Sequence, residues 1–198
     1  MNALLIVDIQ YDFLPGGALQ VNRGDEIIPI VNELQNKFEC VVATKDWHPA
    51  DHKSFAANHN GKQPGDRIKL NGQDQILWPV HCVQNSRGSE ITAGIHRQRI
   101  EKIILKGTNR EIDSYSGFFD NGHLQATELE DYLRSRGVNA VYIVGLAADY
   151  CVKFTALDAV ELGFTTHVIS EATRAVNLQS GDFEKALEEM KEAGVTLS

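Results

Sequence analysis

Short apolar runs alternate with longer amphipathic stretches along most of the chain. Five of the runs are almost continuous in apolar or β-branched residues, which is typical of parallel strands that are covered on both faces. A sixth run is weaker but has the same character. In chain order, the predicted strands span residues 3–8, 40–46, 102–106, 140–145, 164–170 and 194–198.

Several of the intervals between these runs carry apolar residues at helical spacing. Between the first two runs, for example, Ile27, Val31 and Leu34 recur every three or four positions, as on one face of a helix. Glycines in "RSRGV" and "ELGFT" would end two of the helices. The predicted helices span residues 25–38, 124–136, 150–162 and 182–193.

This alternation predicts an α/β protein: a three-layer sandwich whose right-handed crossovers place helices on both faces of a mostly parallel sheet. The chain has 198 residues, so we expect a single domain over residues 1–198. Residues 47–98 depart from the alternation, because they are rich in His, Asn, Gly and Pro and lack clear periodicity. A long irregular insertion in a compact domain usually has a function, so we expect this one to contribute to the site.

Composition and charge argue against several kinds of partner. Acidic residues outnumber basic ones by 27 to 19, and no Lys/Arg cluster offsets the formal charge of −8, so a nucleic-acid partner is not expected. No membrane contact is expected either, since no apolar stretch approaches the roughly 20 residues of a spanning helix. The three cysteines are an odd number without a secretion signal, which indicates free thiols and a cytoplasmic location. A homo-oligomer is compatible with the sequence, which does not fix the oligomeric state.

Four reactive side chains lie at or just after the ends of predicted strands. Asp8 ends the first strand, Asp46 the second and Lys106 the third, and Cys151 follows the fourth by six residues. Ligands of open α/β sheets bind beyond the carboxyl ends of the strands. The sequence therefore predicts that these four side chains converge at one edge of the sheet.

Cys151 is a small core residue, a metal ligand or a nucleophile, and the first of these is the usual role of a free cysteine. Here it lies where a helix should begin, with Asp149 as the expected N-cap. Backbone N–H groups at a helix start could stabilise a thiolate or an oxyanion. Lys106 could hold the thiolate and Asp8 could take its proton. This context favours a nucleophile.

The irregular insertion contributes a second set of polar residues. In "TKDWHPADHKSF", Asp46 and His48 lie two positions apart just after a strand, and "LWPVHCVQ" adds His81. Imidazole and carboxylate ligands together suit zinc, iron or manganese, so we expect one divalent metal ion on these three residues. His52 is the candidate fourth ligand, either directly or through water. The remaining histidines are interpreted as surface or turn residues: His59, His96, His123 and His167.

Five motifs in order resemble those of the nicotinamidases, in the isochorismatase-like cysteine hydrolase superfamily. They are "LLIVDIQYDFLPGGAL", "TKDWHPADHKSFA", "LWPVHCVQ", "LKGTNREIDSYSGFFDN" and "GLAADYCVKFTALDA", and together they span nearly the whole chain. The resemblance implies the isochorismatase-like fold with a six-stranded parallel sheet. It also implies hydrolysis of nicotinamide to nicotinate and ammonia through a cysteine thioester, with activity on pyrazinamide.

The same resemblance implies roles for individual residues. Asp8, Lys106 and Cys151 match the catalytic triad, and Asp46, His48 and His81 match metal ligands, the metal holding the ring nitrogen of the substrate. Aromatic pocket walls fall on Phe13, Trp78 and Tyr115. A cis peptide between Leu146 and Ala147 is implied, with an oxyanion hole formed by the N–H groups of Ala147 and Cys151.

Two other functions remain open from the sequence. A metal-free amidase of the same superfamily would act on another small amide, but it would leave Asp46, His48 and His81 without a purpose. A non-catalytic sensor that binds a metal or a thiol reagent would not explain Lys106, which disfavours cations but suits a thiolate.

Overall fold

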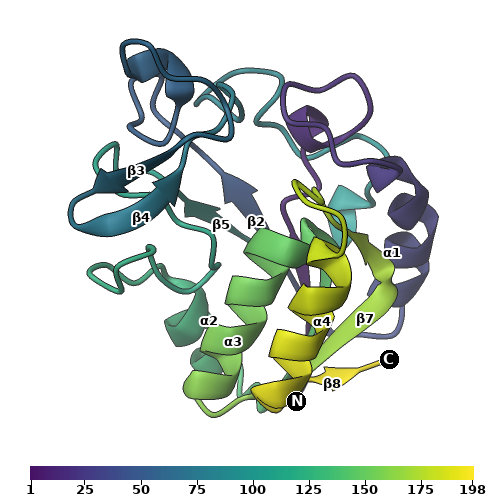
Figure 1. Cartoon of the computed structure of the whole chain (residues 1–198). Helices are drawn as coiled ribbons and strands as arrows, with labels where there is room; N and C mark the ends of the chain where they lie inside the picture. Colours follow the sequence, from purple (N-terminus) through teal and green to yellow (C-terminus); the bar gives the residue numbers. More distant parts are fainter.

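Six strands form one parallel sheet at the centre of the molecule (Figure 1), in a computed structural model that describes residues 1–198. Across the sheet the order is β5-β2-β1-β6-β7-β8, and every neighbouring pair is parallel. The strands are β1 (Asn2–Val7), β2 (Cys40–Asp46), β5 (Lys102–Lys106), β6 (Ala140–Leu146), β7 (Thr165–Arg174) and β8 (Thr196–Leu197). All six predicted strands are therefore confirmed.

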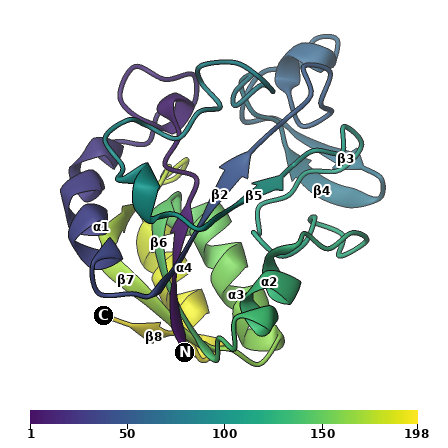
Figure 2. The ribbon, with the colours of Figure 1, turned by 180° about the vertical axis from the view of Figure 1, so that it is seen from behind.

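Helices cover both faces of this sheet. Seen from the two sides in Figures 1 and 2, α1 (Ile27–Gln35) lies on one face. The opposite face carries α2 (Leu129–Ser135), α3 (Lys153–Glu161) and α4 (Asp182–Glu192). None of the helices combines the length and the apolar character needed to cross a membrane.

The alternation of side chains along β1 explains how one strand serves two layers. Leu4 and Ile6 pack into the apolar cluster that contains Ile27 of α1. Leu5 and its neighbours on the same side pack into the cluster that contains Leu129 of α2. Successive side chains of a strand point to opposite faces, so a strand that packs against helices on both faces needs a continuous apolar run. The predicted three-layer α/β sandwich is confirmed.

Strand β7 runs four residues past its predicted end, α1 is shorter than predicted, and α3 begins three residues late. Two further differences lie close to the site. Residues 47–98 are not wholly irregular, since they contain an antiparallel hairpin of β3 (Arg67–Leu70) and β4 (Gln73–Ile76). Helix α2 begins at Leu129 rather than at 124. The preceding residues instead turn around the carboxylate of Asp120, which accepts N–H groups from three residues after it. Side-chain to backbone bonds of this kind compete with helix formation.

The strand order shows where a crevice forms at the edge of the sheet. The chain adds β2 and β5 on one side of β1 and then returns to add β6 on the other side. Loops on the two sides of such a switch point diverge and leave a crevice at the carboxyl ends of the strands. Asp8 directly follows β1, and Cys151 follows β6 by five residues, so both lie at this crevice.

Candidate active site

Asp8, Lys106 and Cys151 meet at the carboxyl edge of the sheet. The ammonium nitrogen Nζ of Lys106 is 2.8 Å from Asp8 Oδ2 and 3.4 Å from Cys151 Sγ. Carboxylate oxygens of Asp8 and of Asp46 both lie within 4.8 Å of the sulfur. The lysine thus lies in contact with both other members of the predicted triad.

Lys106 makes further contacts besides those with Asp8 and Cys151. Its ammonium also donates to the backbone carbonyl of Ser114 at 3.0 Å and to Asp46 Oδ1 at 2.5 Å. Burial disfavours the ammonium, but the carboxylates of Asp46 and Asp8 outweigh it and raise the pKa of Lys106 well above its usual range. The residue is a permanent, fully buried cation.

Burial also acts on the pKa of Cys151. Burial raises the pKa of the Cys151 thiol well above its usual range, although Lys106 acts in the opposite direction. Lys106 thus favours the thiolate, whereas burial disfavours it. Burial also raises the pKa of Asp8 against the effect of Lys106. A carboxylate with a raised pKa beside a protonated thiol is suited to accept its proton.

Cys151 lies in a single π-helical turn, Ala148–Val152, between β6 and α3. The prediction that Asp149 caps this helix is wrong. Its carboxylate accepts the N–H groups of Val176 and Asn177 at 3.0 and 2.8 Å, and so ties the turn to the loop after β7. The partners of Asp149 are set by tertiary packing, because the two donors lie 27 and 28 positions further along the chain.

The peptide between Leu146 and Ala147 is cis, as the resemblance implies. The N–H of Ala147 donates to no backbone carbonyl. This N–H is therefore free to bind another acceptor.

Asp46, His48 and His81 form a second cluster that shares Asp46 with the first. The Nε2 atoms of His48 and His81 lie 3.6 and 3.7 Å from Asp46 Oδ2. The other oxygen of Asp46 is the one that binds Lys106. Burial acts to raise the pKa of Asp46, but Lys106 and His48 outweigh it and lower that pKa well below its usual range.

Backbone carbonyls orient both imidazoles. His48 Nδ1 donates to the carbonyl of Gly107 at 2.9 Å, and His81 Nδ1 to the carbonyl of Pro79 at 2.8 Å. A proton on Nδ1 leaves the lone pair on Nε2, which is the arrangement found around metal-ligating histidines. Gly107 is required here, because a Cβ at this residue would lie 2.3 Å from the His48 ring.

The charges around the cavity also fit a divalent cation. Asp8, Asp46 and Asp113 are buried carboxyl groups, and the buried cation Lys106 pairs with the first two of them. When the carboxyl groups are ionised, two negative charges are left without a counter-charge. Burial acts to lower the pKa of His48, but Asp46 outweighs it and raises that pKa. The site thus favours positive charge at His48 Nε2, whether from a proton or from a metal ion.

His52 lies beside this cluster but not within it. Its ring centroid is 4.4 Å from that of His48, yet its ligand atoms group with His48 and Asp113 rather than with Asp46 and His81. The N–H of Ser54 donates to His52 Nδ1. The other ring nitrogen, Nε2, is buried and has no hydrogen-bond partner in the protein.

Cys151 of the first cluster and all three residues of the second line one cavity. The three aromatic residues implied by the resemblance, Phe13, Trp78 and Tyr115, line it together with Cys151. The Tyr115 hydroxyl accepts hydrogen bonds from Trp78 Nε1 at 3.1 Å and from Gln75 Nε2 at 3.2 Å. These bonds fix the walls of a slot that suits a flat ring.

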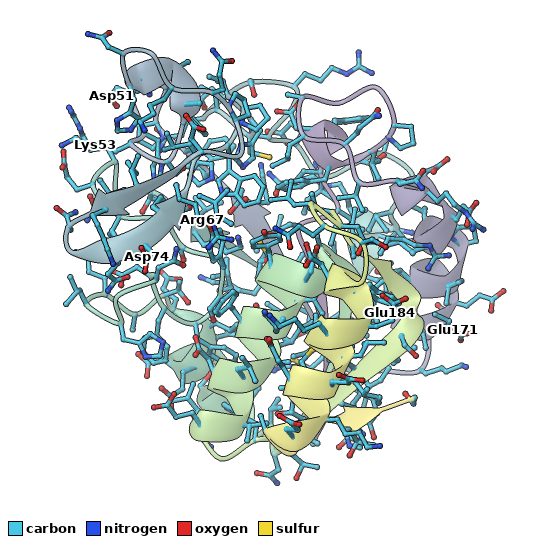
Figure 3. The ribbon with its side chains drawn as sticks, viewed as in Figure 1. Asp51, Lys53, Arg67, Asp74, Glu171 and Glu184 are labelled. Atoms are coloured by element: carbon cyan, nitrogen blue, oxygen red, sulfur yellow. The ribbon has the colours of Figure 1, made fainter.

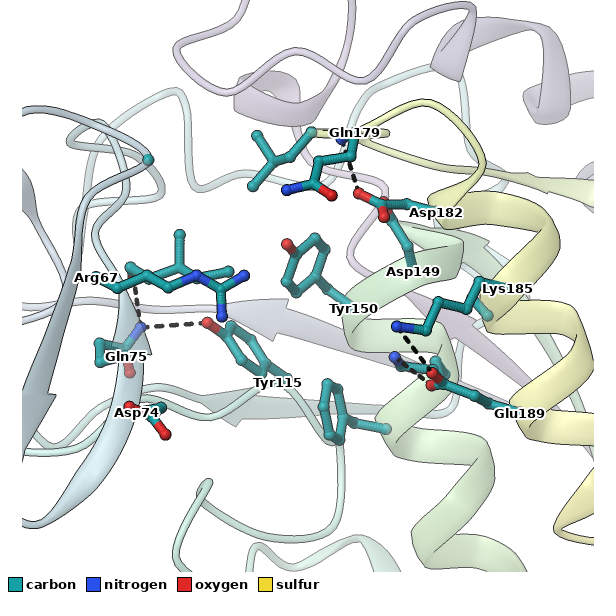
Figure 4. A pocket seen from close by; sticks show the side chains of 16 residues that line it. Arg67, Asp74, Gln75, Tyr115, Asp149, Tyr150, Gln179, Asp182, Lys185 and Glu189 are labelled. Atoms are coloured by element: carbon teal, nitrogen blue, oxygen red, sulfur yellow. Dashed lines mark hydrogen bonds and ion pairs between the residues drawn. The ribbon is translucent and has the colours of Figure 1, made fainter.

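A larger hollow of about 1370 Å³ adjoins this cavity between the β3–β4 hairpin and helices α3 and α4 (Figure 4). The two share only Tyr115 and Tyr150. None of the predicted triad or metal residues lines the larger hollow, so the chemistry belongs to the smaller cavity.

Sequence reasoning missed two residues that support Asp46 and the cavity. Gln10 is fully buried, and its amide accepts the N–H of Asp46 and donates to the carbonyls of Asp46 and Ser89, each at 2.8 Å. Asp113 lines the cavity and accepts from Gln75. The only signal for Gln10 was its place two positions after Asp8, within a motif already singled out.

The buried charges differ from the other charged residues of the chain. Charged side chains labelled in Figure 3, such as Asp51, Lys53 and Asp74, lie at the periphery, where the side chain of Asp74 is 73% exposed. Asp8 and Lys106 have fully buried side chains. Burying charge is expensive unless it is paired or functional, so this cluster is the strongest candidate for chemistry.

Comparison with known proteins agrees with this geometry. A family model described as the isochorismatase domain matches residues 2–198. The chain belongs to the isochorismatase family of α/β proteins. Within that family it is 47% identical to the nicotinamidase of Escherichia coli (strain K12) over 199 residues, which cover 98% of this chain and 93% of that protein. The resemblance to the nicotinamidases, which are amidohydrolases, is confirmed.

Two solved structures extend the likeness to three dimensions. An Acinetobacter baumanii protein described as a nicotinamidase and pyrazinamidase has a TM-score of 0.96 at 46% identity, covering 99% of this chain and 94% of that one. A pyrazinamidase of Pyrococcus horikoshii in complex with zinc has a TM-score of 0.80 at 40% identity, covering 100% and 98%. A six-stranded parallel sheet in an isochorismatase-like fold is thereby confirmed.

Proposed function

We propose that this protein hydrolyses nicotinamide to nicotinate and ammonia, and deamidates pyrazinamide as well. The observation that carries the proposal is the contact of Lys106 with Asp8, Cys151 and Asp46, because Cys151 and Asp46 line the aromatic cavity. Relatives described as acting on these amides support the choice of substrate.

In the proposed reaction Asp8 removes the proton of the Cys151 thiol when the substrate arrives, and Lys106 stabilises the resulting thiolate. The sulfur attacks the carboxamide carbon, and the N–H groups of Ala147 and Cys151 bind the oxyanion. Collapse of this intermediate breaks the C–N bond, and the proton held by Asp8 leaves with ammonia. Water, deprotonated by Asp8, then cleaves the thioester, and the thiolate recovers that proton as nicotinate departs.

Asp46, His48 and His81 would hold one divalent metal ion such as zinc, iron or manganese, with His52 Nε2 placed to contact it through water. When bound, the metal would hold the ring nitrogen of the substrate and so position the ring. The protein's own contribution is to orient the amide: Phe13, Trp78 and Tyr115 confine the ring between apolar faces. Orientation of a bound substrate is itself a large part of catalysis.

A metal-free amidase of the same family remains the second candidate. It would use the same triad on a different small amide. The two buried carboxyl charges that lack a counter-charge, and imidazoles whose Nδ1 atoms are committed to backbone carbonyls, favour the metal-dependent reaction.

The first test is ammonia release from nicotinamide by the metal-loaded protein and by Cys151→Ala. Removing a covalent nucleophile costs at least ~10³-fold in turnover, so release should fall to near background in the variant. Cys40→Ala is the matched control, because Cys40 is also a buried free thiol but lies at the opposite, amino end of strand β2.

Cys40→Ala should keep its activity. Normal release by Cys151→Ala would exclude covalent catalysis by this residue. No release by folded, metal-loaded wild type would show that the substrate is another amide, while the family assignment would stand.

A further inference from the structure

A second cluster of metal-ligating side chains lies away from the cavity, where the loop before α2 meets helix α3. His123 Nε2 is 3.3 Å from Asp158 Oδ1. Glu161 completes the cluster, and one ligand atom from each of the three residues lies within 4.8 Å of the others. Asp158 and Glu161 are three positions apart on α3, so they share one face of the helix. The proposed reaction uses none of the three.

The carboxylate of Asp158 has an oxygen that the protein leaves without a partner. Asp158 is 6% exposed, and its Oδ2 is buried with no hydrogen bond. Such atoms are rare in native proteins, because a buried carboxylate oxygen that lacks a donor loses its hydration without compensation. The pair with His123 occupies Oδ1 only. A cation shared by these side chains would provide the missing partner.

The surroundings of Asp158 are suited to a cation. The residue lines a hollow of about 600 Å³ together with Asp74, Asp120 and His123. No lysine or arginine lines this hollow, so an entering cation meets carboxylates and no fixed positive charge.

His123 is held in position before any ligand binds. Its turn is fixed by the carboxylate of Asp120, which accepts N–H groups from Gly122, Leu124 and Gln125 at 2.9 to 3.0 Å. The imidazole also stacks on Phe119, with ring centroids 4.6 Å apart. A ligand that is already ordered loses little conformational entropy on binding.

We propose that His123, Asp158 and Glu161 form a second metal site, which takes a divalent transition-metal ion such as zinc. One imidazole nitrogen and two carboxylates suit such ions. His123 is half-exposed and Glu161 is exposed, so ions reach the site from solvent. The metal would join the loop that carries Tyr115 to the helix that follows Cys151, and would stabilise the folded chain without entering the reaction.

The test is the number of zinc ions bound per chain, measured by equilibrium dialysis and elemental analysis on the full chain. Wild type should bind two, whereas His123→Asn and Glu161→Gln should each bind one. His48→Ala, which removes a ligand of the cavity set, should also keep one. Loss of a partner around a metal weakens binding about 10- to 100-fold, so zinc titration of the His123 and Glu161 variants should show at least a tenfold weaker second site.

Matched controls are His96→Asn and Glu188→Gln, which alter exposed residues of the same types elsewhere. Both should bind two zinc ions, and all variants should keep the ammonia release of wild type except His48→Ala. A single zinc in wild type would overturn the proposal. So would a second zinc that persists in both His123→Asn and Glu161→Gln, because Asp158 would then be satisfied by water or by its ion pair alone.

Discussion

The pKa of Asp8 depends on a balance between its burial and its neighbours. Burial raises this pKa, Lys106 lowers it, and the hydroxyl of Thr44 lowers it further by donating to Oδ1 at 2.6 Å. A general base works best when its pKa lies near the working pH. If Asp8 is the base of the proposed reaction, the residues around it set the pH range in which that reaction proceeds.

Thr44→Val should move the acid limb of the pH–activity profile to higher pH. The Thr44 hydroxyl stabilises the ionised carboxylate, so without it the pKa of Asp8 rises and the base is available only at higher pH. A hydrogen bond to a charged group is worth roughly 1.5–3 kcal/mol, which corresponds to about one to two pKa units. The measurement is kcat/KM against pH. Thr166→Val, a buried threonine that donates to the carbonyl of Phe164, should leave the limb in place, and an unmoved limb in Thr44→Val would contradict this role.

Gln10 acts on the metal cluster through the backbone of Asp46. Its side-chain amide binds the backbone N–H and carbonyl of Asp46, as a neighbouring strand would. These bonds fix the position of Asp46, whose carboxylate contacts Lys106 through one oxygen and His48 through the other. It is a positioning residue, because it lies behind Asp46 and does not line the cavity.

Gln10→Met should weaken metal binding and kcat/KM together, by about 10- to 100-fold, as expected for a partner behind a ligand. The variant keeps the volume of the side chain but leaves an N–H and two carbonyls without their partner. Gln35→Met is the control, since Gln35 is equally buried and bonds to Asn32 outside the site. Metal affinity is measured by competition with a chelator. A loss of stability with unchanged metal affinity would show that Gln10 is only structural.

At the scale of elements, the site is built from strand ends and from the short segments that follow them. Lys106 ends β5, and Gly107 comes directly after it with φ of +63°. This reversal turns the carbonyl of Gly107 toward His48 Nδ1. Gly107 thus follows Lys106 directly in the chain and also orients the ring of His48 through its carbonyl.

Gly107→Ala should lose metal binding and activity. The new Cβ would lie 2.3 Å from the His48 ring, in a backbone conformation that costs a side chain roughly 1–2 kcal/mol. Gly61→Ala separates the two effects, because Gly61 has a similar φ of +72° with nothing within 4 Å. Metal content and ammonia release are compared in the two variants. Equal effects in both would mean that backbone strain alone matters and that the His48 ring is not displaced.

At the scale of the whole molecule, the buried charges make folding and metal binding interdependent. Asp8 and Asp46 come before the irregular region, Asp113 comes after it, and all three are buried. Their mutual repulsion is present only in the folded chain. A cation that binds the folded state and not the unfolded chain stabilises it by mass action.

Removal of the metal should therefore lower Tm as well as activity. At a free metal concentration a hundredfold above Kd the stabilisation is about 2.7 kcal/mol, which for a chain of this size corresponds to a Tm shift of roughly 5–10 °C. Calorimetry with chelator and with added zinc measures it, and zinc should restore both properties. In His48→Ala most of the shift should disappear. An unchanged Tm and unchanged activity after verified metal removal would refute a required metal.

Local patterns in the sequence determined the strands, the α/β class and the identity of the residues at the strand ends. This was possible because burial on both faces requires nearly continuous apolar runs, and because parallel strands bring their carboxyl ends to one edge. Asp8, Asp46, Lys106 and Cys151 could thus be assigned to one edge from the order of the runs alone. The family motifs added the aromatic walls and the cis peptide.

Only the tertiary structure decided how these residues interact. Asp46 serves two clusters, Gln10 holds it from 36 positions away, and Asp149 binds the loop after β7 rather than capping a helix. Burial is likewise the largest influence on the pKa of Cys151, and no local pattern reveals it. Sequence patterns report which face of an element is apolar, whereas hydrogen bonds, charge and desolvation depend on atoms brought together from distant parts of the chain.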